Sequence, residues 1–175
     1  MKVHQYLKEV KTNPFLESQQ IIYKESTIFD MVRRFINQLS FFEDIDLNGV
    51  KVADVGCGVG IATNYFKWRG ANVVGFEPDT NNYNSSRKIF PDLTVVNGMF
   101  DKNKYDIITL FGVRQFISKS SDVDDMFTNC RLLVIDNAYE IPEQYSVDLR
   151  KQYFCPISKR LRQFTVYKNH DFTQV

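Results

Sequence analysis

With 175 residues, 43% hydrophobic and 25% charged, the chain is long enough to bury the core of one domain and is not disordered. Its 22 basic and 21 acidic residues leave a formal net charge of +1. That balance provides no broad positive surface for general nucleic-acid binding, although a nucleic-acid partner stays open.

The first third of the chain is predicted to be helical. A short helix from about Val3 to Val10 is ended by Asn13-Pro14, because the residue before a proline avoids helical geometry. Ser26 or Thr27 can cap a second helix, in which apolar residues recur at helical spacing as far as Leu39.

From Lys51 onward, short apolar strands alternate with helices of about ten residues. The expected strands cover residues 51–55, 73–76, 93–96, 106–111, 132–135, 152–155 and 164–167, and the expected helices cover 61–69, 80–89 and 122–130. Such alternation implies a mainly parallel sheet with helices on both faces, that is, a three-layer αβα sandwich. We expect residues 1–45 to form a helical extension or lid and residues 46–175 to form the main domain.

The most informative segment is Asp54-Val55-Gly56-Cys57-Gly58-Val59-Gly60, followed by Glu77 at the end of the second strand. Alternating glycines let the backbone turn sharply and approach a ligand that a Cβ atom would obstruct. A carboxylate after the second strand can accept hydrogen bonds from both hydroxyls of a ribose. Each such bond contributes about 1.5–3 kcal/mol. The segment therefore predicts a nucleoside site at the carboxyl ends of the strands.

Two kinds of nucleoside cofactor could use such a loop. A dinucleotide needs a third small residue at G-x-G-x-x-G spacing, where this chain has Ile61 or Thr63, according to the register. The carboxylate of Asp54 would repel a pyrophosphate but attract an ammonium or a sulfonium group. S-adenosylmethionine carries both groups, so it is favoured over a nicotinamide dinucleotide.

Three segments resemble class I (Rossmann-like) S-adenosylmethionine-dependent methyltransferases. Asp54 to Gly60 resembles the first motif of the family, Val74 to Asp79 its second, acidic motif, and Tyr105 to Phe111 its fourth-strand motif. The resemblance covers residues 50–167. It implies a seven-stranded sheet in which the last strand is antiparallel, with S-adenosylmethionine as the cofactor.

The resemblance also implies a set of cofactor-binding residues. Asp54 would read the ammonium group, directly or through water, and Glu77 would hold the ribose. Pro78 would pack on the adenine, and Phe111 would face the amino-acid end. The full set is Asp54, Gly56, Cys57, Gly58, Gly60, Glu77, Pro78, Asn97, Gly98, Met99, Phe111 and Gly112.

The chain departs from the family at two places. Met99 stands where many members have an aspartate that accepts from the adenine amino group, so Asn97 or a backbone amide would replace it. Gln115-Phe116 stands where many small-molecule enzymes have Glu-His, so no general base is identified. Arg114, Gln115 and Tyr139 are candidate catalytic residues, beside the simpler interpretation that they are surface or loop residues.

The absence of certain motifs disfavours some classes of methyl acceptor. After the fourth strand there is neither the Pro-Pro motif of DNA amino-methyltransferases nor the Pro-Cys of C5-cytosine enzymes. We expect transfer to oxygen or nitrogen of an unidentified acceptor, with a small molecule or sugar favoured and protein or RNA left open. The alternative is a non-catalytic relative that binds the cofactor or serves as a partner subunit; the oligomeric state stays open.

The N-terminus and the cysteines favour a cytoplasmic location. The first residues lack the apolar segment of a signal peptide, and no apolar run is long enough to cross a bilayer, so no membrane partner is expected. Cys57, Cys130 and Cys155 are widely spaced and never form a CxxC pair. We therefore expect neither a disulfide framework nor a metal site, with Cys130 and Cys155 as packed side chains.

Overall fold

The computed structural model describes residues 2–11, 28–111, 120–136, 146–155 and 160–172. Its helical elements are α1 (Lys2–Lys11), α3 (Ile28–Leu39), the 3₁₀ turn η2 (Ser40–Phe42), α4 (Ile61–Trp68), α5 (Thr80–Ile89) and α6 (Ser120–Thr128). Its strands are β1 (Lys51–Val55), β2 (Asn72–Phe76), β3 (Val95–Val96), β4 (Tyr105–Phe111), β5 (Cys130–Asp136), β6 (Ser146–Cys155) and β7 (Arg160–Lys168).

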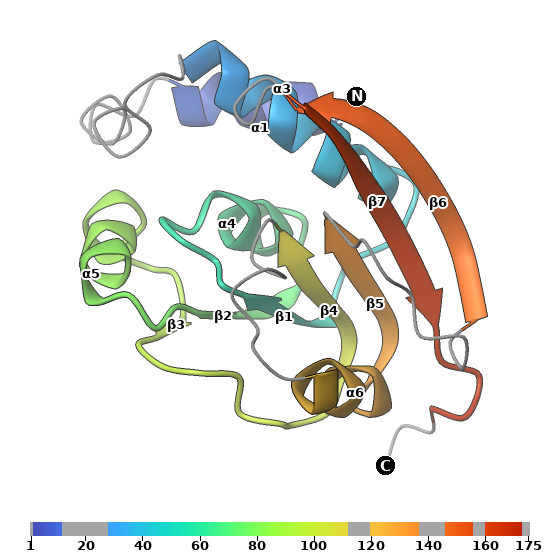
Figure 1. Cartoon of the computed structure of the whole chain (residues 1–175). Coiled ribbons are helices and arrows are strands. Elements are labelled where there is room, and N and C mark those ends of the chain that lie inside the picture. The colour runs from blue at the N-terminus through green and yellow to red at the C-terminus, as the bar shows by residue number, and fades with distance from the viewer. Residues whose placement is uncertain (1, 12–27, 112–119, 137–145, 156–159, 173–175) are drawn as a thin grey trace.

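The strands form one sheet with the order β3-β2-β1-β4-β5-β7-β6 (Figure 1). Pairing is parallel from β3 to β5, whereas β7 runs antiparallel to both β5 and β6. The predicted mixed sheet with a reversed last strand is confirmed. The strand order changes direction between β1 and β4, and ligands of open α/β sheets bind beyond the carboxyl ends at such a point.

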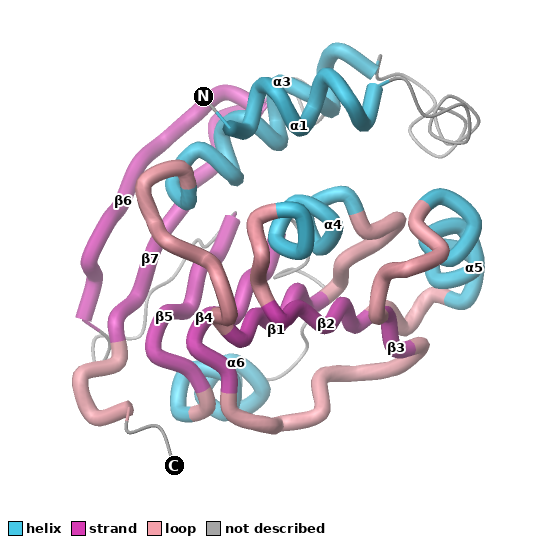
Figure 2. The backbone as a smooth tube through the Cα atoms, turned by 180° about the vertical axis from the view of Figure 1, so that it is seen from behind, coloured by secondary structure: helices cyan, strands magenta, loops and turns pink. Residues whose placement is uncertain are grey.

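Helices lie on both faces of the sheet, as predicted (Figure 2). The face under α4 shares its core with α1 and α3, whose buried residues include Tyr6 and Leu39. Val123 and Met126 of α6 pack against the opposite face. Within the described ranges α6 is the one helix on that face. No helix among these residues is long and apolar enough to cross a bilayer.

The N-terminal helices are joined to the sheet through α4. The hydroxyl of Tyr6 donates to Ile61 O at 2.6 Å and accepts from Asn64 Nδ2 at 3.1 Å. Val3 and Leu7 are buried beside it, 0% and 3% exposed. Helix α1 therefore packs on the first turn of α4, next to the glycine loop.

Several predicted elements have different bounds in the structure, most of all the last two strands, which cover Ser146–Cys155 and Arg160–Lys168 where 152–155 and 164–167 were expected. The helix expected over 122–130 ends at Thr128, because Cys130 instead pairs with Tyr105 and opens β5. The strand expected over 93–96 shortens to Val95–Val96, since Leu93 N donates to Phe90 O and closes a turn. Cys130 is fully buried, as predicted, whereas the side chain of Cys155 and the proposed caps Ser26 and Thr27 lie outside the described residues.

Candidate functional site

The glycine loop between β1 and α4 is built from left-handed backbone. Gly56, Gly58 and Gly60 have φ angles of 70°, 57° and 86°. The φ angle of Gly60 favours glycine, and a Cβ atom there would also lie 2.8 Å from Leu93 Cδ2, so that side chain would have to shift. A Cβ atom on Gly58 would meet nothing within 4 Å. Gly58 therefore borders open space, where a ligand could approach the backbone.

Glu77 meets this loop directly. Gly58 N donates to Glu77 Oε2 at 2.7 Å, and Asp79 N donates to Oε1 at 2.9 Å. Because β1 and β2 are parallel neighbours, their carboxyl ends bring the loop and the acid together, as the spacing predicted. Each carboxylate oxygen can still accept a further hydrogen bond, since each has two lone pairs.

Asp54 lies in the interior below the loop. Its side chain is 1% exposed, and its oxygens accept from Thr63 Oγ1 at 2.6 Å and from Thr109 Oγ1 at 2.8 Å. Burial raises the pKa of Asp54, the two threonine hydroxyls oppose that shift, and the charge of Glu77 adds to it. The carboxyl group thus connects β1 to α4 and β4.

Cys57 contributes its backbone to the loop and its side chain to the interior. Its Sγ would lie 2.8 Å from a Cβ atom on Gly75 of β2, so the thiol fills the space above that glycine. Burial raises the pKa of the Cys57 thiol, and the charges of Asp54 and Glu77 raise it further. The side chain is a packed, protonated thiol.

Asn97 holds the segment that follows β2. Its Nδ2 donates to Glu77 O at 2.9 Å and to Pro78 O at 3.4 Å, while its Oδ1 accepts from Thr80 Oγ1 at 3.3 Å. Gly98 N also donates to Glu77 O, at 3.2 Å. Met99 is 66% exposed next to them. The structure thus brings Asn97, Gly98 and Met99 beside Glu77.

A second polar cluster lies at the carboxyl ends of β4 and β5. Asp136 is 0% exposed and accepts from Gln38 Nε2 at 2.6 Å, from Tyr153 Oη at 2.9 Å and from Arg162 Nη1 at 3.2 Å. Arg34 Nη2 is 4.0 Å from Asp136 Oδ2 and donates to Phe111 O at 3.1 Å. Helix α3 therefore lies over the ends of both strands (Figure 1).

Sequence interpretation missed the partners of Asp136. One signal was present for Gln38, which lies three residues after Phe35 and seven after Met31 and so falls on the apolar stripe of its helix. A polar residue in that position requires a buried partner. Nothing local indicated that the partner lies at the end of β5, since Gln38 and Asp136 are 98 residues apart.

Several predicted site residues lie outside the described part of the chain: Gly112, Arg114, Gln115 and Tyr139. Within the described part, no group of three or more histidine, cysteine, aspartate or glutamate side chains is arranged to hold a metal ion.

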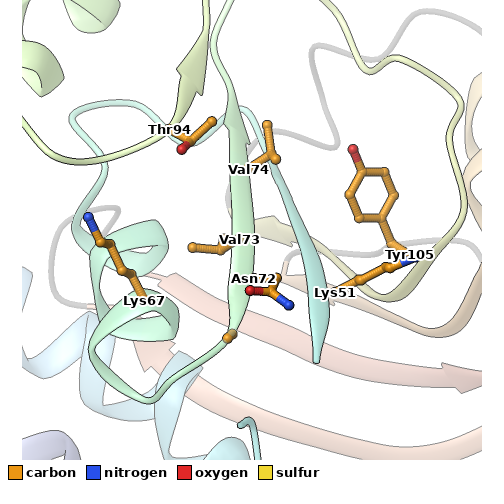
Figure 3. A pocket seen from close by; sticks show the side chains of 8 residues that line it. Lys51, Lys67, Asn72, Val73, Val74, Thr94 and Tyr105 are labelled. Carbon is orange, nitrogen blue, oxygen red and sulfur yellow. The ribbon is translucent and has the colours of Figure 1, made fainter. Parts of the chain in front are cut away.

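An open hollow of about 430 Å³ lies away from the glycine loop (Figure 3). Lys51 and Asn72, which line it, begin β1 and β2, so it lies at the amino edge of the sheet. Val73 and Val74 of β2 line it too, together with Lys67 of α4, Tyr105 of β4, Ala71 and Thr94. The hollow is therefore separate from the candidate site.

The strand order, the glycine loop after β1 and the acid after β2 together define a class I, Rossmann-like methyltransferase. A family model described as a methyltransferase domain matches residues 25–134, and the chain belongs to that family. The resemblance noted from the sequence is confirmed, and S-adenosylmethionine is the cofactor of this class.

Solved structures share the fold at low sequence identity. Protein 1320 of Thermoplasma acidophilum superposes with a TM-score of 0.66 at 17% identity, over 98% of this chain and 100% of the other. The magnesium protoporphyrin IX methyltransferase of Synechocystis, solved with bound S-adenosylmethionine, has a TM-score of 0.64 at 14% identity, over 96% and 97%. A comparison with curated proteins gives no match.

Proposed function

We propose that this protein transfers a methyl group from S-adenosylmethionine to an oxygen or nitrogen of a small-molecule acceptor. The observation that carries the proposal is the contact between Gly58 N and Glu77 Oε2 beside open space. This contact brings together the two features that a nucleoside site needs: a backbone that the ligand can approach closely and a carboxylate that can bind the ribose.

The residues around the loop fit this cofactor. The site where a Cβ atom of Gly58 would lie is open, so a ligand can contact the backbone there. Glu77 keeps free lone pairs for ribose hydroxyls, although it already accepts two backbone N–H groups. The carboxylates of Glu77 and Asp54 make this region suited to a cation, as a sulfonium with an ammonium group requires.

We assign the remaining residues by their contacts. Asn97 is a positioning residue that holds the backbone of Glu77 and Pro78, beside which an adenine would lie with Gly98 and Met99. Asp54 influences the cofactor site indirectly, through Thr63 and Thr109, because the hydroxyls of these two residues enclose its carboxylate.

When bound, S-adenosylmethionine supplies a methyl carbon already activated by the sulfonium. The task of the protein is then to align the acceptor with that carbon and to exclude water, and alignment alone can provide about 7–11 kcal/mol. A general base is needed only for an acceptor that is protonated at the working pH, so none is assigned. Among the described cysteines, Cys57 and Cys130 are free thiols, which supports our proposal of a cytoplasmic location.

The first test is calorimetric titration of the protein with S-adenosylmethionine and S-adenosylhomocysteine. We expect Glu77→Ala to weaken binding of both by about 2–3 kcal/mol, because it removes charge-assisted hydrogen bonds to the ribose. Asp171→Ala, which removes an exposed carboxylate after the end of β7, is the matched control and should leave binding unchanged.

An unchanged dissociation constant in Glu77→Ala would remove Glu77 from the site. Transfer of labelled methyl groups to candidate acceptors then tests catalysis. Binding of the cofactor without turnover on any acceptor would favour the alternative of a non-catalytic, cofactor-binding subunit.

A further inference from the structure

The inner face of α3 presents two polar side chains to the carboxyl edge of the sheet. Arg34 and Gln38 are four residues apart and so share one face of the helix. Arg34 reaches Phe111 O at the end of β4, and Gln38 reaches Asp136 at the end of β5. In the sheet, β4 and β5 lie about 5 and 10 Å from β1, so this face adjoins the glycine loop.

The orientation of the Gln38 amide is determined by its partner. The Asp136 carboxylate, which also receives the Arg162 guanidinium, accepts hydrogen bonds, so the NH₂ group of Gln38 must face it. The carbonyl Oε1 consequently points elsewhere. It is buried and has no hydrogen-bond partner among the described residues. Buried acceptors without a partner are exceptions in folded proteins, and a donor group on a ligand would satisfy this one.

Arg34 has a complementary donor. Its Nε is buried without a hydrogen-bond partner in the described chain, while its Nη2 donates to the neutral carbonyl of Phe111. The side chain as a whole is 12% exposed, although the Nε atom itself is buried. An arginine edge with a free Nε is suited to a carboxylate or phosphate oxygen.

The charges around α3 also favour an anion. Asp136 is the one described carboxylate within 4.0 Å of Arg34, and it is shared with Arg162 at 3.2 Å. Lys151 adds a third basic side chain, whose Nζ donates to Asn37 O of α3 at 2.9 Å; burial lowers the pKa of Lys151, and the charge of Asp136 opposes that shift. One buried carboxylate is thus surrounded by three basic side chains.

We propose that the methyl acceptor is a small anion, a carboxylate or a phosphate, that also carries a hydroxyl or an amine. Its anionic oxygen accepts from Arg34 Nε, and its hydroxyl or amine donates to Gln38 Oε1. Asp136 is a positioning residue, because it fixes the amide of Gln38. That the bound anion is the methyl acceptor rests on the proposed methyl transfer. That an anion binds at this place can be tested independently.

The probes are sodium phosphate and sodium acetate, compared with sodium chloride at equal ionic strength. Melting temperature is measured for the full chain, Arg34→Gln and the control Arg33→Gln, each with and without S-adenosylhomocysteine. We expect phosphate or acetate to raise the melting temperature of the native chain and of Arg33→Gln, and the larger response distinguishes a phosphate site from a carboxylate site. In Arg34→Gln the anion should bind at least about tenfold more weakly, the effect of one charge-assisted hydrogen bond.

Equal anion responses in the native chain and Arg34→Gln would overturn the proposal, and so would no response in either. Should Arg34→Gln not fold, Arg34→Lys keeps the charge but loses Nε, and an unchanged anion affinity would overturn the proposal equally. The measurements with S-adenosylhomocysteine test the proposed function separately. If S-adenosylhomocysteine does not raise the melting temperature but the anion does, the methyltransferase proposal is rejected and the anion site is retained. In a labelled-methyl screen, a neutral acceptor whose KM is unaffected by Arg34→Gln would also contradict it.

Discussion

The two halves of the carboxyl edge are built in different ways. At the ends of β1 and β2 the contacts are short in sequence, with Gly58 and Glu77 separated by 19 residues, and the loop contributes mainly backbone groups. At the ends of β4 and β5 the contacts are made by side chains of α3 to residues 77 and 98 positions away, from Arg34 to the Phe111 carbonyl and from Gln38 to the Asp136 carboxylate. A local motif therefore defines the first half, and only the tertiary fold assembles the second.

The halves also differ in charge. The first contains the carboxylates of Asp54 and Glu77, whereas the second gathers Arg34, Lys151 and Arg162 around one carboxylate. The formal net charge of +1 conceals this separation. Composition describes the average surface, while ligand choice depends on the local field.

The largest effect on stability is expected from removing the Asp136 carboxylate, which holds together the polar cluster at the ends of β4 and β5. Asp136→Asn leaves the Arg162 guanidinium, 7% exposed, without its buried carboxylate, so the free energy of unfolding should fall by about 3–5 kcal/mol. Urea denaturation measures the change. Asp44→Asn, at an exposed position, is the control and should stay within about 0.5 kcal/mol. A loss below about 1 kcal/mol in Asp136→Asn would show that the cluster does not support the fold.

Two alanine substitutions test the glycine loop between β1 and α4. Gly60→Ala should lower the free energy of unfolding by about 1–3 kcal/mol, because the left-handed backbone is strained and the new methyl group meets Leu93.

Gly58→Ala has room for its methyl group in the free protein but places it in the proposed ligand space. It should therefore weaken S-adenosylhomocysteine binding at least about tenfold in calorimetry, with a stability cost of about 1–2 kcal/mol from the backbone alone. Equal affinities in Gly58→Ala and the native chain would place the ligand elsewhere.

The smallest expected effect is on the pH dependence of stability, through the carboxyl group of Asp54. Because its pKa in the folded state is raised above the ordinary value of 3.8, the native chain holds this proton longer than the unfolded chain. The contribution of Asp54 to stability is therefore highest below that ordinary value and decreases as pH rises toward the folded-state pKa. In urea denaturation between about pH 4 and pH 7, Asp54→Asn should gain stability relative to the native chain as pH rises. Parallel curves would mean that burial does not shift this group.

Much of the fold could be predicted because its signals are local. The mainly parallel sheet follows from alternating strands and helices, and the glycine loop and Glu77 are set by spacing along the chain. The bounds of β3 were wrong because the turn at Leu93 depends on its contact with Phe90. The direction in which Asp54 points could not be predicted, since β1 is buried on both faces and shows no alternation.

The stretch recognised by sequence comparison, residues 25–134, is shorter than the unit that folds. Residues on either side of it complete the hydrophobic interior: Val3, Tyr6, Leu7, Tyr153, Phe164 and Val166. A fragment trimmed to the recognised stretch would expose the apolar partners of these side chains to water and would be prone to aggregate. Expression should therefore include the residues on both sides of the recognised stretch, because they close the same interior.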